Sequence, residues 1–507
     1  MKKRIFSFFA VVALAFSAMA QPQMPAFSFG GAGKGFDYLM AHNSHIVANL
    51  GDELLIATWE TWGFLGTLAP KGLQVVAVDK NLKELRQVSL PDTRMHELVF
   101  ANYVDGRVYL LYRDEFLPRY YRAVVEPRSM TLESCEQVFD KEVGKNTVYY
   151  HWHAQSDNKL FFAMAEVVVS DVSKEMRHRQ ILLDEKMEVL WEKHFETNVL
   201  SELRVSDDGE VYLFGSRYDS ESRETVVSLH VLDVDDERSV NGRVRIGEVY
   251  GLELVNIVGG GESSSPLYAV AAGYIRSSES PKKKDWFDQM VGMSLNIRTG
   301  ELKAKAVRFT SDELNVFGNK GTKKENKVGM TDALVMANSV GTNYGGVMLL
   351  QRIWKVTTRS TKAPDVHDYY TMGSLAFGVD TTAAILWHMP FRTVTGERTG
   401  SAFDVPCYGD APMLAEGDNV YVMLPESSKT TETYDITSSV SKIKLGNRTH
   451  ASVVYGIDRL GQVAKQIPIP KDKASLMDNM VRLEEGKYMG VCSFYKKSAL
   501  VYVDFLK

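Results

Sequence analysis

Cysteine is scarce in this chain: Cys135, Cys407 and Cys492 are the three among 507 residues. None is adjacent to another, and none forms a Cys-x-x-Cys pair. This excludes paired-thiolate metal and redox motifs and the dense disulfide framework of small secreted domains. A chain of this length can bury a core that needs no disulfides. The thiols are interpreted as buried small apolar side chains, and a Cys407–Cys492 bridge is the alternative.

Local catalytic motifs are also missing. The sequence has no Gly-x-Ser-x-Gly elbow, no Walker phosphate loop and no His-Glu-x-x-His pair. Their absence excludes the enzyme classes that a local motif identifies. It favours a protein that is not an enzyme.

The chain lacks an excess of positive charge. Its formal net charge is −5, which becomes −8 when the three basic residues Lys2, Lys3 and Arg4 are removed. A mildly acidic protein has no general electrostatic attraction to the phosphate backbone of nucleic acid or to anionic lipid. We therefore expect neither as a partner.

Long apolar runs are confined to the N-terminus. Basic residues at positions 2–4 precede an apolar run from Ile5 to Phe16, and Ala18-Met19-Ala20 has the small residues of a cleavage site. This order predicts a signal peptide over residues 1–20. The run is too short for a permanent membrane anchor. The mature chain is expected to be exported, either periplasmic, on the cell surface or secreted, and to have no transmembrane anchor.

What the chain does have is a repeat. An apolar stretch, an acidic or Gly turn and a second apolar stretch recur at Val104–Leu111, Val205–Phe214, Gly417–Met423 and Glu485–Val491. The spacing of roughly 50 residues is typical of propeller blades. It predicts an all-β fold: a monomeric β-propeller over residues 21–507 with eight four-stranded blades, seven being the alternative. The units are His45–Leu90, His96–Phe139, Tyr149–Phe195, Leu200–Val249, Leu252–Phe309, Ala333–Phe391, Pro412–Pro468 and Met480–Phe505.

The last unit lacks a fourth strand. A ring of blades closes without an unpaired edge when the other end of the chain supplies that strand. Ala26–Phe29 and Phe36–Met40 are the two candidates for it. The polar stretch at about 310–331 interrupts the repeat and is interpreted as an insertion between the fifth and sixth blades.

The corner between the third and fourth strands repeats too. Asp79, Asp184, Asn296, Asp380 and Asp458 each follow an apolar strand and open a turn, where the side chain can bond its own backbone. These corners resemble those of quinoprotein-type, WD40-like propeller repeats. The resemblance implies the fold alone, because the quinone-dependent members also carry adjacent cysteines, which this chain lacks.

The connections differ in length on the two faces of the predicted disc. Long second-to-third connections are expected at Glu60–Gly72, Arg276–Asp288, Lys355–Asp368 and Glu426–His450. Long loops are uncommon without a use, so the loop-rich face is the predicted binding surface. Trp59 and Trp62 fall in a Gly-containing loop there and are ligand-binding candidates; the alternative is that they cover the core.

The starts of the innermost strands should meet at the mouth of a central funnel. The polar residues at these positions are Asn43, His45, His96, Glu97, His151, His153, Glu202, Asp332, Asp410 and Asp478. Strand alternation places His151 and His153 on one side, so with His45 or His96 they could hold a transition metal such as Zn²⁺. Ordinary strand histidines are the alternative, and we expect no cofactor otherwise.

The leading hypothesis is an exported propeller that binds a protein or glycan partner through its loop-rich face. The second is a polysaccharide-acting hydrolase or lyase with its site in the funnel, metal-dependent if the histidines bind an ion. The residues alone do not decide whether the protein is an enzyme, and they lean against it.

Overall fold

The computed structural model describes residues 22–30, 44–64, 67–91, 93, 96–114, 119–139, 147–170, 176–195, 202–259, 266–276, 287–310, 313, 334–358, 366–399, 412–427, 443–444, 450–467, 475–494 and 497–507. The regular elements in these ranges are β-strands. The predicted signal peptide, Cys407 and all of the 310–331 insertion except Thr310 and Glu313 lie outside the described residues. Among the described residues, none belongs to a helix long and apolar enough to cross a membrane.

The strands form eight sheets, called blades 1 to 8. Blade 1 holds β2 (Ser44–Asn49), β3 (Glu53–Phe64), β4 (Thr67–Asp79) and β5 (Glu84–Ser89). Blade 2 holds β6 (His96–Val104), β7 (Arg107–Asp114), β8 (Tyr120–Glu126) and β9 (Thr131–Phe139). Blade 3 holds β10 (Thr147–Gln155), β11 (Phe162–Ser170), β12 (Met176–Leu183) and β13 (Val189–Phe195). Blade 4 holds β14 (Glu202–Val205), β15 (Val211–Asp219), β16 (Glu224–Leu232) and β17 (Glu237–Val244).

The second half of the chain continues the pattern. Blade 5 holds β18 (Val249–Gly259), β19 (Pro266–Arg276), β20 (Phe287–Asn296) and β21 (Leu302–Arg308). Blade 6 holds β22 (Leu334–Thr342), β23 (Gly345–Thr358), β24 (Val366–Asp380) and β25 (Ile385–Thr399). Blade 7 holds β26 (Met413–Glu416), β27 (Asn419–Ser427), β29 (His450–Ile457) and β30 (Val463–Gln466). Blade 8 holds β31 (Ser475–Glu484), β32 (Lys487–Phe494), β33 (Lys497–Asp504) and β1 (Ala26–Phe29).

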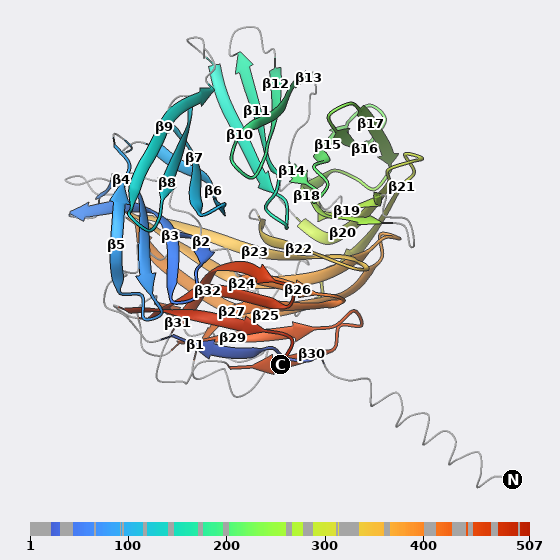
Figure 1. The fold of residues 1–507 in the computed structure, drawn as a ribbon. Coiled ribbons are helices and arrows are strands. Elements are labelled where there is room, and N and C mark those ends of the chain that lie inside the picture. The colour runs from blue at the N-terminus through green and yellow to red at the C-terminus, as the bar shows by residue number, and fades with distance from the viewer. Residues whose placement is uncertain are drawn as a thin grey trace, which may run out of the picture.

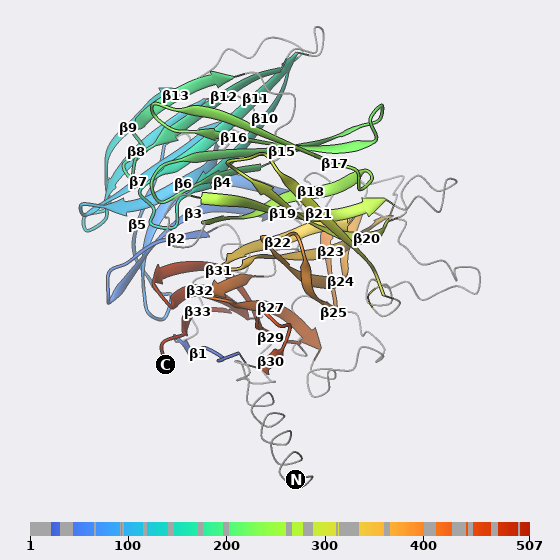
Figure 2. The same ribbon diagram turned by 90° about the vertical axis from the view of Figure 1, so that its right-hand side faces the viewer.

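The two ends of the chain meet in blade 8. Strand β1 pairs antiparallel with β33, from Ala26 opposite Asp504 to Phe29 opposite Val501. Figure 1 shows blue β1 beside the red strands, with the other blades following one another around the molecule, and Figure 2 shows the same order from the side. The eight-bladed propeller and its closure by Ala26–Phe29 are confirmed.

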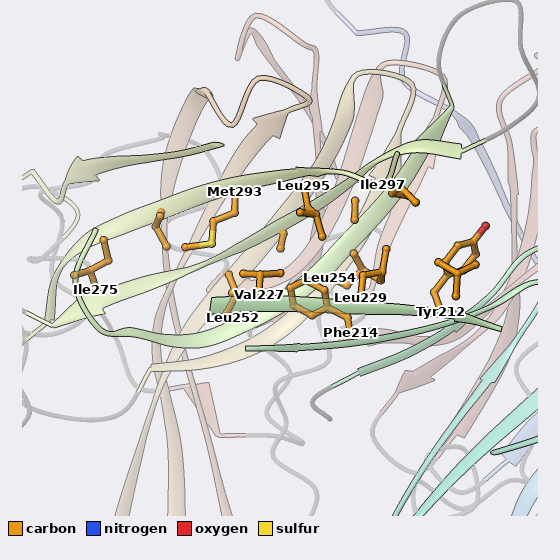
Figure 3. Packing of buried hydrophobic residues seen from close by; sticks show 14 residues of the cluster. Tyr212, Phe214, Val227, Leu229, Leu252, Leu254, Ile275, Met293, Leu295 and Ile297 are labelled. Atoms are coloured by element: carbon orange, nitrogen blue, oxygen red, sulfur yellow. The ribbon is translucent and has the colours of Figure 1, made fainter. Parts of the chain in front are cut away.

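The core is divided among the blade interfaces. Each of eight hydrophobic clusters in the described residues joins two consecutive blades. Between blades 4 and 5, Phe214 and Leu229 pack against Leu254 and Met293 (Figure 3). The cluster containing Ile56 and Met489 joins blade 8 back to blade 1. Burial of apolar surface therefore holds the ring together all the way round.

The predicted corner chemistry is present. The Asp79 Oδ1 atom accepts hydrogen bonds from the backbone N–H groups of Asn81 and Lys83, both at 2.8 Å. Equivalent pairs of bonds occur at Asp184, Asp380 and Asp458. In three of these corners the third residue after the Asp has a left-handed backbone although it is not glycine. These residues are Leu82, Met187 and Ala383. Each of the three side chains is almost fully buried, so apolar packing offsets the backbone cost.

Two predicted loops are wrong. The expected loop Glu60–Gly72 mostly extends the hairpin β3–β4, and both ends of the expected loop Lys355–Asp368 extend the hairpin β23–β24, while residues 359–365 lie outside the described part. Trp59 and Trp62 therefore lie in β3, where their backbones pair with Leu73 and Ala69; their side chains lie outside the described part. The period-2 signal of a strand does not show where a hairpin ends. A further short strand, β28 (Ile443–Lys444), pairs parallel with β25.

Candidate functional site

The first strands of the blades lie toward the middle of the ring (Figure 1), and those of blades 1 and 2, 3 and 4, 5 and 6, 6 and 7, and 8 and 1 approach one another. Polar side chains on these strands, joined by Arg113 from the second strand of blade 2, gather in two groups. The histidine group consists of His45, Glu97, Arg113, His151 and His153. The glutamate group consists of Glu202, Arg204, Glu253 and Ser339.

The histidine group draws on blades 1, 2 and 3. Glu97 and Arg113 lie directly opposite each other in the β6–β7 pair, and the Arg113 Nη2 donates to Glu97 Oε2. On β10, the rings of His151 and His153 stack with centroids 5.3 Å apart and planes at 13°. Both histidines lie close enough to Arg113 and Glu97 to interact with their charges, and His153 also interacts with His45.

The histidines of this group are neutral at physiological pH. Burial, followed by the positive charge of Arg113, lowers the pKa of His151 to about 4. Burial also lowers the pKa of His153, although its side chain is exposed. His45 combines exposure with a lowered pKa in the same way. Exposure and a lowered pKa occur together when a side chain reaches solvent but is surrounded by many protein atoms. A position near the axis of the ring provides such surroundings.

His96 does not join the group. Its ring packs edge-on against Tyr112 and Tyr121, with centroids 5.5 and 5.1 Å apart. These tyrosines belong to the interface between blades 1 and 2, whereas Leu111 and Phe100 face blade 3. The prediction that His96 meets His151 and His153 is therefore not supported by its packing.

The remaining side chains of β10 provide an aromatic surface. Tyr150 stacks on Trp152 with centroids 6.3 Å apart and planes at 29°. Tyr150 is 51% exposed, which is high for an aromatic side chain on an inner strand. Trp152 packs against the cluster between blades 3 and 4. The strand thus carries the aromatic rings on its blade 4 side and the two stacked imidazoles on its blade 2 side.

A buried ion-pair network stands behind His151. Glu166 lies opposite His151 in the β10–β11 pair and is fully buried. Its neighbour Arg179 forms a two-point bond to Glu192, with Nε to Oε1 and Nη2 to Oε2 both at 2.9 Å. The Arg179 guanidinium also lies over the Phe139 ring, 5.4 Å from its centroid. Such a network holds blade 3 in a fixed position against blade 2.

The glutamate group joins blades 4, 5 and 6. The Arg204 Nη2 lies 2.7 Å from Glu202 Oε1 and donates to the Leu254 carbonyl at 3.0 Å and to Ser339 Oγ at 3.2 Å. The second oxygen of Glu202 accepts the Leu254 N–H. Glu202, like Glu97 of the histidine group, is a predicted funnel carboxylate that pairs with an arginine in the described structure.

Glu253 is the unusual member of this group. Burial, and then the negative charge of Glu202, raise the pKa of Glu253 to about 7. Strand β18 is irregular on both sides of it, with register shifts between Tyr250 and Glu253 and between Leu254 and Asn256. Bulges of this kind redirect a side chain and are frequent beside active sites. Burial also raises the pKa of Glu202, but the charge of Arg204 and the Leu254 N–H oppose that rise. Two neighbouring carboxyl groups in different environments can divide acid and base roles.

The proposed metal ligands stay a prediction. Among the described residues, no group of three or more His, Cys, Asp or Glu side chains has the arrangement of a metal site. Asn43, Asp332 and Asp410 lie outside the described ranges, and so does the side chain of Asp478. The interpretation of the thiols as buried is wrong for Cys135, which is an exposed free thiol hydrogen-bonded to the Tyr112 hydroxyl. The proposed Cys407–Cys492 bridge falls outside the described part of the chain.

Sequence reasoning missed Arg113, Arg204, Glu253 and Tyr150. Arg204 follows Glu202 by two positions, so strand alternation alone could have placed both on one side. Arg113 lies on a second strand and meets Glu97 only through the register of the pair. The direction of the Glu253 side chain depends on the bulges of β18, and no local sequence pattern indicates these bulges.

No protein-family model and no curated protein matches this chain. Among solved structures it is similar to the Dos1 propeller, at 8% identity and a TM-score of 0.40 over 95% of each chain. An oligogalacturonate lyase in complex with manganese matches at 12% identity and a TM-score of 0.35, over 80% of this chain and 95% of the other. A prolyl endopeptidase matches at 10% identity and a TM-score of 0.32, over 94% of this chain and 54% of its own. Such distant likenesses carry no argument about activity, and the strand pairing itself establishes this chain as an eight-bladed β-propeller.

Proposed function

We propose that this protein is exported and binds a glycan beside the axis of the ring, at the inner strands of blades 1 to 3. A protein partner bound through the same face is the alternative. The observation that carries the proposal is β10, the innermost strand of blade 3, which carries the exposed Tyr150 ring on its blade 4 side and the neutral imidazoles of His151 and His153 on its blade 2 side. Sugar rings stack on exposed aromatic faces, and neutral imidazoles both donate and accept hydrogen bonds from hydroxyl groups.

The fixed geometry of blade 3 favours the same proposal. The paired groups Glu166, Arg179 and Glu192 lie across the blade behind the imidazoles. A site whose supporting side chains are already bonded loses little conformational freedom when a ligand binds.

The Tyr150→Ala variant is expected to bind the glycan about tenfold more weakly, since a stacked ring contributes on the order of 1 kcal/mol. A glycan array with wild-type protein identifies the ligand, and calorimetry then compares the variants. Phe29→Ala is the matched control, because Phe29 is an aromatic residue with 36% exposure on the outermost strand of blade 8. Equal affinity for all three proteins would place the glycan elsewhere.

A polysaccharide hydrolase is the second candidate function, and Glu253 favours it. With a pKa of about 7, Glu253 holds a proton at neutral pH part of the time and would donate it to a glycosidic oxygen. Water would attack the anomeric carbon and release a proton to Glu202, so that one water is consumed for each bond broken. The observation is specific to this carboxyl pair and independent of the proposed glycan site on β10.

A further inference from the structure

The guanidinium of Arg113 has more hydrogen-bond donors than partners. Arg113 is 8% exposed, and a guanidinium carries five N–H donors. One bond, to Glu97 Oε2, is short, and a second, from Nη1 to the Asp114 carbonyl, is 3.5 Å long. The buried Nε has no hydrogen-bond partner within the described structure. Buried charged donors rarely lack a hydrogen-bond partner in folded proteins.

The surroundings of Arg113 supply further donors and little competing charge. Among the described residues, Glu97 is the one carboxylate paired with Arg113, and the Glu97 side chain is 34% exposed. The stacked imidazoles of His151 and His153 lie within reach of the Arg113 charge. Two other arginines of this interface, Arg122 and Arg179, are already bound to carboxylates. The unfilled bonding capacity is therefore concentrated at Arg113.

We propose that Arg113, together with His151 and His153, forms an anion subsite that binds the carboxylate or sulfate group of an acidic sugar. This inference rests on the proposed function, since it names the class of glycan that the site prefers. An anionic oxygen would fill the donors that Glu97 leaves open, and the imidazole N–H groups would bond its second oxygen. Arginine suits this role because its planar donors match carboxylate and sulfate oxygens.

In this subsite Glu97 competes with the incoming anion for the guanidinium of Arg113. Its carboxylate neutralises Arg113 in the ligand-free protein and repels an incoming anion. Replacing it by Gln keeps the size of the side chain but removes the charge. The Glu97→Gln variant should therefore bind acidic sugars more tightly than the wild type does, although its fold loses an ion-pair partner. A purely structural Arg113–Glu97 pair would not produce this gain.

The experiment measures binding of sodium glucuronate, glucose 6-sulfate, glucose and sodium acetate at equal ionic strength, by calorimetry and ligand-observed NMR. Wild type, Glu97→Gln, Arg113→Gln and Tyr150→Ala are compared. We expect the wild type to bind at least one acidic sugar about tenfold more tightly than glucose, and Glu97→Gln to raise that ratio about a further tenfold. Arg113→Gln should remove the preference but leave glucose binding. The two acidic sugars distinguish a carboxylate from a sulfate ester.

Each outcome decides the proposal. Equal binding of glucose and both acidic sugars overturns the anion subsite and leaves the glycan function standing. Acetate binding that is lost in Arg113→Gln, together with no binding of any sugar, supports the subsite and contradicts the glycan function. If Arg113→Gln does not fold, the Glu97→Gln ratio still decides, and an unchanged or lower ratio overturns the proposal. No binding of all four probes overturns it as well.

Discussion

Deleting residues 22–30 is expected to lower the free energy of unfolding by about 4 kcal/mol or more, because the deletion opens the ring. Strand β1 is the outermost strand of blade 8 and pairs along its full length with β33. The Gly30 N–H donates to the Leu500 carbonyl at 3.0 Å, and Tyr421 donates to the Gln23 carbonyl at 2.7 Å. The segment therefore bonds to blades 7 and 8 together.

Apolar packing adds to the loss. Met24 and Phe27 pack against the cluster that joins blades 7 and 8. Without them, that interface and the edge of β33 are both exposed, so the truncated protein should also aggregate more readily. Chemical denaturation followed by tryptophan fluorescence measures the stability, and light scattering measures the aggregation.

Two point variants separate packing from strand pairing. Phe27→Ala should cost about 1 to 2 kcal/mol, because it removes a partly buried ring. Phe29→Ala is the control, because Phe29 occupies the same strand but is 36% exposed. If the truncated protein unfolds at the same denaturant concentration as the full-length chain, β1 does not hold the ring closed.

The Glu253→Gln variant is expected to be more stable than the wild type at pH 8 by between about 1 and 3 kcal/mol, and equally stable at pH 4. The folded protein holds the Glu253 proton up to a pKa of about 7, whereas the unfolded chain releases it near the ordinary value of about 4.5. Between these values the folded state binds more protons than the unfolded state. Wild-type stability attributable to Glu253 therefore falls as pH rises through this window and is constant above it.

Glutamine removes this pH dependence because it carries no charge at any pH. Urea denaturation at pH 4, 5, 6, 7 and 8 measures the difference between the two proteins. Glu221→Gln is the control, since Glu221 is an exposed residue of the β15–β16 turn. A constant difference between wild type and Glu253→Gln across the whole range would show that Glu253 ionises as an ordinary surface carboxyl.

The same variant tests the hydrolase. If Glu253 is the proton donor, Glu253→Gln should lose turnover of a polysaccharide substrate by about a hundredfold or more while gaining stability. Loss of function combined with a gain in stability is typical of a residue kept for chemistry. Turnover that survives the substitution would exclude Glu253 from catalysis.

Much of the fold could be predicted from the sequence because turn residues repeat along the chain as well as apolar stretches. Asp79 and its four equivalents open the corners of five blades and bond their own backbone. The sequence therefore shows where the third strand of these blades ends. Turn residues such as Asp105 and Gly106 mark the first hairpin in the same way. The extension of β3 through Trp59 and Trp62 carries no such mark, since a long hairpin and an apolar loop have similar composition.

The site was less predictable because it depends on register. His151 and His153 are two apart on one strand, and alternation was enough to bring them together. The partnership of Glu97 and Arg113 depends on how β6 and β7 align, with a register shift between Leu98 and Phe100. One residue of slip would have moved Arg113 to the other face of the blade.

The pairing of Ala26 with Asp504 also sets an order of events during synthesis. Blades 1 to 7 are each built from one continuous stretch of chain, so they can form as the polypeptide emerges. Blade 8 must wait for the last residues to be made before its first-made strand finds a place. The joining of the two chain ends is thus the slowest kind of contact for a folding chain, one between its most distant segments. Until β1 pairs with β33, the strand edge of blade 8 stays exposed, and exposed strand edges favour aggregation.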